Sequence, residues 1–289
     1  MTIVTEPGIH YDLLEAEYHA DPVEGGSLSQ SGAKLLLEPA GPARYLDNLT
    51  RKIDRPEFAF GRAAHELVLG VGASWVEAPY PDFRKKEARE WRDEQVAAGL
   101  TVVSATDAAT IREMAAAIRA NACAMDSLQG IPEVSMFDQV DGVWMRGRVD
   151  VLGDGVITDY KTSAAHADAR TFAAGAARYG YHMQVANYLD MARGLGLDVD
   201  RFRFVVQEKQ PPYLVSLLEL DEEFIQIGRE RMARARAIYR ECRETGIWPG
   251  YPNEVQTVAA PAWCVSEHYS TLDPQLESEL LALTHKESA

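Results

Sequence analysis

Two aspartates and a lysine stand near the middle of the chain, on two apolar, β-branched segments joined by an Asp-Gly step. The first segment contains Asp150, the step is Asp154-Gly155, and the second segment contains Asp159 and Lys161. Asp-Gly between such segments is a strong short-range signal for a β-hairpin with a two-residue turn. Counting outward from that turn places Asp150 opposite Asp159, so we expect two carboxylates to face each other across the hairpin.

Two opposed carboxylates need compensation, because like charges on directly paired strand residues destabilise a sheet. A divalent cation held by Asp150, Asp159 and the main-chain carbonyl of Tyr160 would provide it, with the ammonium of Lys161 on the same face. Such a cation activates bound water and clamps a phosphate group, which is the chemistry of phosphodiester hydrolysis. From the hairpin alone, the alternative is a pair of acids that turn aside into water.

Two further candidates come from segments that precede the hairpin. His65 belongs to a helix expected over residues 57–69, where a lone histidine is more often a packed residue at the core boundary than a ligand. A nitrogen from His65 suits Mn²⁺ somewhat better than Mg²⁺, whereas oxygen ligands suit either ion. Glu133 begins a strand that Asp141-Gly142 turns into the first hairpin strand. An exposed strand-end glutamate is an equal alternative there.

A helix expected over residues 181–192 follows the hairpin. Gln184 and Tyr188 stand four residues apart and therefore share one side of it. Ordinary amphipathic packing would produce the same spacing. Their position after the Asp-x-Lys motif makes them candidates for orienting a substrate strand or the side chain of Lys161.

The remaining segments predict a mixed α/β chain. An alanine-rich helix is expected over residues 105–125, and a long helix over 221–245 follows two strands at 201–207 and 213–220. Residues 1–26 are expected to be irregular.

Two charged segments are candidates for a basic surface. At about 100° per residue, the long helix places four arginines on one stripe, which is either a DNA-facing surface or a solvated helix face: Arg229, Arg236, Arg240 and Arg243. Residues 72–100 carry a charged run that we expect to be mobile or solvated, with basic residues able to form a DNA-facing edge.

Composition limits the classes of protein that remain. The formal net charge of −15 repels a polyanion at long range and counts against binding of nucleic acid unless basic groups gather locally. No apolar run approaches the roughly 20 residues of a membrane span, and the first residues lack the regions of a signal peptide. We therefore expect a cytoplasmic protein without membrane contact. The cysteines are 3 in number and scattered, which predicts neither disulfides nor a cysteine-bound metal cluster.

The hairpin motif resembles the signature of the PD-(D/E)xK nuclease superfamily. Asp150 followed by Asp159-x-Lys161 is similar to the RecB-like branch of that superfamily. Val149 stands where the superfamily name has proline, and this departure is common in the branch.

Motifs on either side of the hairpin extend the resemblance. In the RecB-like branch a helix supplies a metal-binding histidine, a strand often begins with an acid, and Gln-x-x-x-Tyr lies beside the active site. His65, Glu133, Gln184 and Tyr188 stand in that order here. The resemblance implies that His65 ligates a metal and that the other three residues belong to the active site.

Finer similarity is to the nuclease domain of phage-type exonuclease VIII (RecE). It comes from Leu28-Ser29-Gln30-Ser31 and from residues 207–213, and it covers roughly residues 28–263. It implies an α/β fold with a restriction-endonuclease-like core, in which helices flank a central mixed β-sheet. We expect a single nuclease domain over residues 1–289, divided into an N-terminal extension, a core with one charged insertion, and a tail: 1–56, 57–245 with 72–100 inserted, and 246–289.

The same resemblance implies an activity and partners. It implies a Mg²⁺-dependent exonuclease that degrades the 5′-ended strand of linear double-stranded DNA and leaves 3′ overhangs for strand annealing. A homo-oligomeric ring around DNA ends and a RecT-type annealing protein as partner are implied too. In a ring, arginines would line the channel while acids face outward.

Two alternatives stay open. One is another RecB-like nuclease that acts on single strands in repair or defence. The other is a DNA-binding or assembly module without catalysis, against which the intact Asp150, Asp159 and Lys161 speak.

Overall fold

The computed structural model describes residues 2–51, 56–72 and 74–270. The chain divides into two compact units, Met1–Gly250 and Tyr251–Ala289. The second unit contains the described helix α11 (Ala262–Ser270). The strands of the first unit are β1 (Gly8–His10), β2 (Leu28–Ser29), β3 (Trp75–Glu77), β4 (Thr101–Val103), β5 (Ile131–Val140), β6 (Val143–Leu152), β7 (Gly155–Ser163), β8 (Val199–Glu208) and β9 (Val215–Glu219). Its helices are α1 (Glu15–His19), α2 (Gln30–Leu36), α3 (Gly41–Thr50), α4 (Pro56–Leu69), α5 (Lys86–Ala97), α6 (Ala105–Arg119), α7 (Ala122–Ser127), α8 (Ala169–Tyr179), α9 (Tyr181–Gly194) and α10 (Glu222–Thr245).

A mixed sheet forms the centre of the first unit. Its strand order is β1-β5-β6-β7-β8-β9, with β2 pairing on β6. The strands β5, β6 and β7 form the expected antiparallel meander, whereas β8 runs parallel to β7. A parallel neighbour needs a crossover, and α8 and α9 supply it between β7 and β8. The predicted fold class, a central mixed sheet flanked by helices, is confirmed.

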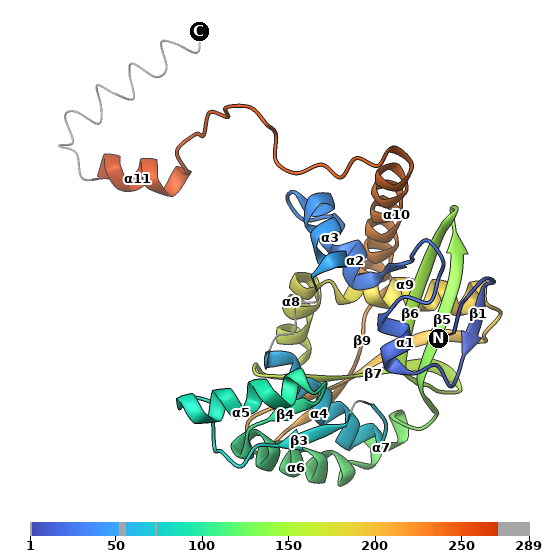
Figure 1. Ribbon diagram of the computed structural model, residues 1–289, viewed down its shortest axis with the longest axis vertical. Coiled ribbons are helices and arrows are strands. Elements are labelled where there is room, and N and C mark those ends of the chain that lie inside the picture. The colour runs from blue at the N-terminus through green and yellow to red at the C-terminus, as the bar shows by residue number, and fades with distance from the viewer. Residues whose placement is uncertain (1, 52–55, 73, 271–289) are drawn as a thin grey trace. The chain divides into compact units, whose positions relative to one another are not determined.

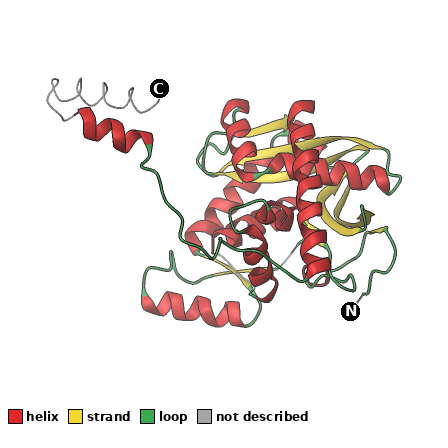
Figure 2. Ribbon diagram, turned by 90° about the horizontal axis from the view of Figure 1, so that it is seen from above, coloured by secondary structure: helices red, strands yellow, loops and turns green. Residues whose placement is uncertain are grey.

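Helices cover both faces of this sheet (Figures 1 and 2). On one face, Met183 and Leu189 of α9 and Met232 of α10 pack with Phe204 of β8 in the larger core cluster. On the other face, Ala63 and Ala64 of α4 and Ile111 and Ile118 of α6 pack with Tyr160 and Val205. Alternate side chains of β7 and β8 therefore enter different cores, as the period of a strand requires. Figure 1 shows α9 and α10 on one side of β7, and α4 and α6 on the other.

The described residues of the charged segment over 72–100 form regular structure, and the charged run is solvated as expected, because most side chains of α5 are exposed. The segment contains β3 and α5, and β3 pairs in parallel with β4 in a small second sheet. The indole of Trp75 donates a 3.0 Å hydrogen bond to Glu66 of α4. One short strand and two buried alanines, Ala78 and Ala88, were too weak a pattern to detect beside so many charges.

Two predictions need correction. Residues 1–26 are not wholly irregular, since β1 pairs with β5 and α1 follows it. The helix expected over 105–125 is broken into α6 and α7, because the side chain of Asn121 accepts the backbone N–H of Ala124 and starts a new helix.

Three arginines of the stripe on α10 bond to other parts of the protein. Arg229 donates to Asp190 on α9, and Arg236 and Arg240 both bond to Asp141 at the tip of the β5–β6 hairpin. Arginines held in such pairs are not a ready basic surface, so this candidate for DNA contact is not supported. No described helix of the chain combines the length and apolarity needed to cross a bilayer.

Candidate active site

The predicted hairpin opens where the two aspartates stand. The amide of Gly153 donates to the carbonyl of Val156 at 2.8 Å, and the paired residues are Leu152 with Ile157 and Val151 with Thr158, which is the register expected from the turn. The ladder ends there, one step before Asp150 and Asp159. Instead of a strand pair, the carboxylate of Asp150 accepts the backbone N–H of Tyr160 at 2.8 Å.

The helix α4 brings His65 to this opening. Its Nε2 lies 3.0 Å from Oδ2 of Asp150, and its Nδ1 lies 3.4 Å from Oε1 of Glu133. Burial alone would lower the pKa of His65, but the charge of Asp150 and its hydrogen bond outweigh burial and raise the pKa to about 9. His65 is therefore a cation that compensates two carboxylates.

Asp159 is held from the opposite side. Only 2% of its surface is exposed, Nζ of Lys161 lies 2.5 Å from its Oδ2, and the amide of Gln184 donates a 2.6 Å hydrogen bond to its Oδ1. Burial raises the pKa of Asp159 to about 6 despite the nearby ammonium. Gln184 therefore contacts Asp159 directly, and the helical spacing of Gln184 and Tyr188 did not predict this hydrogen bond.

The two aspartates have opposite protonation tendencies. Burial would raise the pKa of Asp150 as well, but the charge and hydrogen bond of His65 lower it below its ordinary value.

For Lys161, burial favours the neutral amine, yet Asp159 and Asp150 outweigh it and raise the pKa. The ammonium of Lys161 consequently stays charged, which favours an electrostatic role over proton abstraction.

Glu133 lies beside Asp150 with a strained backbone. Its φ of +57° is in the left-handed region, and its carboxylate pairs with Arg148 as well as with His65. Arg148 also donates to Ser135 at 2.6 Å and to the carbonyl of Leu13 at 2.9 Å. The alternation of β6 already placed Arg148 on the face of Asp150, and this was the signal available for its part in the site.

A pair of substitutions at Glu133 measures this strain. We expect Glu133→Gly to be more stable than Glu133→Ala by about 1 kcal/mol, because glycine adopts a positive φ without steric cost. Both variants lose the same carboxylate, so their difference reports the backbone alone. Urea titration of the two variants provides the measurement. If Glu133→Ala is instead the more stable variant, as in an ordinary strand, the backbone at this position is not strained.

Tyr188 packs against the strand that carries Asp150. A Cβ at Gly147 would lie 2.8 Å from the Tyr188 ring, so only glycine fits beneath it. The ring also lines a hollow of about 290 Å³ together with Asp150, Glu133, Ser29 and Gln30. The structure therefore brings Tyr188 to the site.

The side chain of Tyr160 anchors the middle of β7. It points away from Asp159, into the core beneath α4, where its hydroxyl donates a 2.7 Å hydrogen bond to Gln207. Gln207 in turn donates to the carbonyl of Met114 at 2.8 Å. This buried chain of bonds fixes the backbone whose carbonyl was predicted to bind a metal.

The Tyr160 anchor predicts a stability effect. We expect Tyr160→Phe to lower the free energy of unfolding by about 1 to 3 kcal/mol, because the buried acceptor of Gln207 loses its donor. Thermal unfolding of Tyr160→Phe, Gln207→Leu and the double variant completes a double-mutant cycle. Strictly additive losses would mean that the hydrogen bond contributes nothing.

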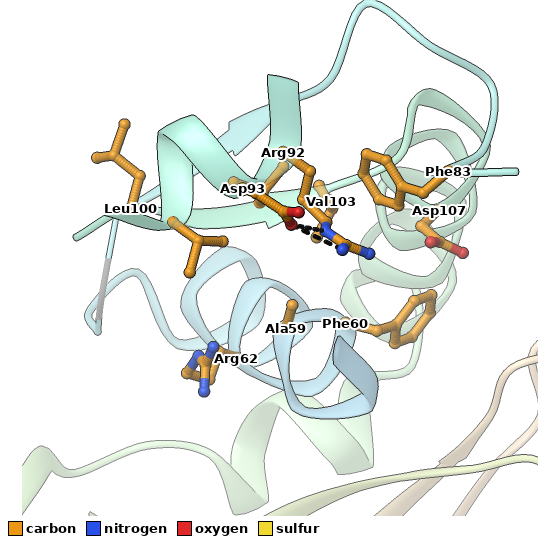
Figure 3. A pocket seen from close by; sticks show the side chains of 11 residues that line it. Ala59, Phe60, Arg62, Phe83, Arg92, Asp93, Leu100, Val103 and Asp107 are labelled. Atoms are coloured by element: carbon orange, nitrogen blue, oxygen red, sulfur yellow. Dashed lines mark hydrogen bonds and ion pairs between the residues drawn. The ribbon is translucent and has the colours of Figure 1, made fainter. Parts of the chain in front are cut away.

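The site faces a second hollow, of about 340 Å³, which adjoins the first at Asp150 and Glu133. His65, Arg62, Lys161 and Thr162 line it. A separate hollow of about 220 Å³ between α4 and α5 contains none of the predicted site residues (Figure 3). There Arg92 bonds twice to Asp93, so its charge is satisfied within the protein.

The donor chemistry of the site suits a hard divalent cation. Carboxylate oxygens and an imidazole nitrogen converge on the opening of the hairpin, and these are ligands of Mg²⁺ and Mn²⁺. Within the described residues, no three such side chains already surround a common metal position. Three carboxylates are instead balanced by three cations: Glu133, Asp150 and Asp159 against His65, Arg148 and Lys161.

Comparison with known proteins assigns the fold. A "putative exonuclease" from Eubacterium rectale has a solved structure with a TM-score of 0.59 and 14% sequence identity, covering 94% of this chain and 100% of that one. The solved structure of SSO0001 gives a TM-score of 0.27 at 15% identity, covering 68% and 97%, which carries no argument. The comparison with curated proteins gives no match.

The mixed sheet carries Asp150 on one strand and the Asp159-x-Lys161 motif on the next, which is the pattern of a PDDEXK-like protein. Residues 29–261 match the family model described as "PDDEXK-like domain of unknown function (DUF3799)". The chain belongs to that family.

Proposed function

We propose that this protein is a metal-dependent nuclease that hydrolyses phosphodiester bonds at the ends of linear double-stranded DNA. The observation that carries the proposal is the meeting of Asp150, Asp159 and Lys161 where the β6–β7 ladder opens, in front of a hollow and within a PDDEXK-like fold.

The residues of the site have two roles, binding a metal ion and orienting its ligands. Asp150, Asp159, His65 and the carbonyl of Tyr160 would hold Mg²⁺ or Mn²⁺, which supplies an activated water and charge stabilisation at the phosphate. Because an imidazole binds a metal only when neutral, His65 gives up its proton to do so. Gln184 orients Asp159, and Glu133 orients His65.

Lys161 stabilises negative charge on the scissile phosphate. Its ammonium lines the hollow in front of the aspartates and stays protonated there. As a flexible point charge it interacts more favourably with the extra negative charge of the transition state than with the ground-state phosphate.

The finer proposal is a 5′-strand exonuclease that leaves 3′ overhangs for recombination. It rests on the resemblance of the ordered motifs to phage-type exonuclease VIII, including Leu28-Ser29-Gln30-Ser31. A homo-oligomeric ring and a RecT-type annealing partner belong to the same proposal. A ring would gather local positive charge in a chain whose formal charge is −15.

A gel assay with end-labelled DNA tests activity and polarity together. Linear duplex labelled at the 5′ or the 3′ end is incubated with protein and Mg²⁺, with Mn²⁺, or with chelator. We expect early release of the 5′ label, slow loss of the 3′ label, and no reaction with chelator. Degradation confined to single-stranded DNA would replace the duplex exonuclease by a single-strand nuclease. Full activity in chelator would refute the metal-dependent mechanism.

A further inference from the structure

A hollow of about 320 Å³ adjoins the site at Lys161, and His65 is not among the residues that line it. Its walls are the loop that follows β7, the helix α8, and the start of α9, and Lys161 and Thr162 belong both to this hollow and to the one in front of the aspartates. We call it the tyrosine hollow, after Tyr179 and Tyr181, which line it with Phe172, Gly175 and His166.

The two tyrosines form an aromatic wall. Their ring centroids are 5.9 Å apart and their planes differ by 35°. Tyr179 exposes 53% of its surface, although burial of an aromatic ring is strongly favourable. The tyrosine hollow therefore presents an apolar face that lies open to solvent.

Local sequence places both rings on this wall. Gly180 between them has φ +76°, the left-handed conformation that ends α8 and allows α9 to start at once. Gly175, one turn before Tyr179, leaves space beside that ring, since a Cβ there would lie 3.8 Å from it. Gly180 thus allows the two tyrosines to follow each other across the helix junction, and Gly175 leaves the edge of the Tyr179 ring uncovered.

Cations surround the aromatic wall. Nζ of Lys161 lies 5.2 Å from the centroid of the Tyr181 ring, and the guanidinium of Arg178 lies 5.9 Å from that of Tyr179. An exposed ring, Tyr179, backed by a half-buried one, Tyr181, with positive charge at the margins is a combination that binds single-stranded nucleic acid through base stacking and phosphate contacts.

We propose that the tyrosine hollow binds the nucleobase of the nucleotide next to the scissile phosphate, stacked on Tyr179. The hollow is continuous with the site at Lys161, so a strand whose phosphate reaches Lys161 carries the adjacent base to this wall. Its volume suits one base, and stacking on a ring is open to any of the bases. This inference rests on the proposed function and adds the part of the substrate that the hollow holds.

The test measures stacking independently of cleavage. A single-stranded oligonucleotide containing one 2-aminopurine is titrated onto the full chain in chelator, and the fluorescence of the 2-aminopurine and the Kd are recorded. We expect quenching with wild-type protein and its loss in Tyr179→Ala, with binding weakened roughly five-fold or more, as expected for one lost base–aromatic stack. Tyr11→Ala is the matched control, because Tyr11 is 47% exposed and lies outside the hollow.

A second variant fills the hollow without removing a ring. Gly175→Leu places a side chain beside Tyr179 and improves helix propensity, so the variant folds. We expect it to lose quenching as Tyr179→Ala does. Quenching that survives in both variants would overturn the tyrosine hollow as a base site.

Cleavage separates this inference from the proposed function. If the wild-type protein cleaves DNA but Tyr179→Ala changes neither quenching nor Kd, the nuclease proposal holds and the tyrosine hollow is not a base site. Quenching that depends on Tyr179, in a protein that cleaves neither duplex nor single strands, supports the base site and refutes the nuclease.

Discussion

Replacing Asp159 with asparagine is expected to lower kcat for DNA cleavage by about a thousand-fold or more, equivalent to about 4 kcal/mol. The substitution removes a carboxylate that we assign to the cation, yet asparagine still offers an oxygen to Gln184, which donates to Asp159 at 2.6 Å. The volume of the site and the bond to Gln184 are therefore kept, while the amide nitrogen of asparagine replaces the oxygen that faces Lys161.

The same variant is expected to stay folded, with a melting temperature close to that of the wild type, because two effects oppose each other. Burial raises the pKa of Asp159 from its ordinary 3.8 to about 6, so the ionised form is less stable folded than unfolded. The folded state loses stability as the pH rises through that interval, and near pH 7 the charge is a cost that asparagine removes. Against this, the ammonium of Lys161 loses the carboxylate that lies 2.5 Å from it. A thermal melt beside the cleavage assay checks both parts.

Asp200→Asn provides the matched control for Asp159→Asn. Asp200 lies on β8 with its side chain 87% exposed, so its loss should change neither rate nor melting temperature. Near-normal cleavage by Asp159→Asn would exclude this residue from the site, whereas an unfolded variant would make Asp159 a structural residue.

Replacing Lys161 with methionine is expected to reduce kcat by about 10²- to 10³-fold while the Kd for DNA changes by less than about three-fold. Methionine keeps most of the aliphatic stem and removes the ammonium, which lies over the Tyr181 ring. A charge that acts mainly on the transition state affects turnover, and a charge that only anchors a phosphate affects binding.

Single-turnover rates and fluorescence titrations distinguish these two roles of Lys161. Lys34→Met is the control, since the stem of Lys34 packs over Gly180 while its charge lies outside the hollows that adjoin the aspartates. Equal losses of rate and affinity in Lys161→Met would make Lys161 a phosphate anchor.

Much of the sheet followed from local patterns. The Asp154-Gly155 and Asp141-Gly142 turns fixed the register of β5, β6 and β7, because a hairpin turn determines which residues pair. Helical periodicity located α4, α9 and α10 within a few residues. Such features depend on neighbours in the chain, and a single sequence contains them.

The arrangement of the site depended on contacts between distant segments. The hydrogen bond from Gln184 to Asp159 spans 25 residues, and that from Tyr160 to Gln207 spans 47. No local period encodes these distances. The opening of the hairpin at Asp150 also escaped the turn rule, since it depends on the acceptance of a backbone N–H by that side chain.

The ion pairs of the arginine stripe were hidden from the sequence for a related reason. Periodicity placed the guanidinium groups of α10 on one face correctly, but it could not reveal that Asp141 and Asp190 come from other elements to pair with them. The helix α5 likewise packs against β4, and no pattern within the residues of α5 predicts that contact.

The amide of Tyr160 is a built-in reporter of events at the neighbouring carboxylate. Its hydrogen is bonded to Asp150 rather than to a strand carbonyl, so its NMR chemical shift and its exchange with deuterated solvent both depend on the electron density at that oxygen. An ion that drew on the same carboxylate would weaken the bond and shift the resonance upfield. One backbone signal, observed in protein alone, would then follow occupancy of the site without any substrate.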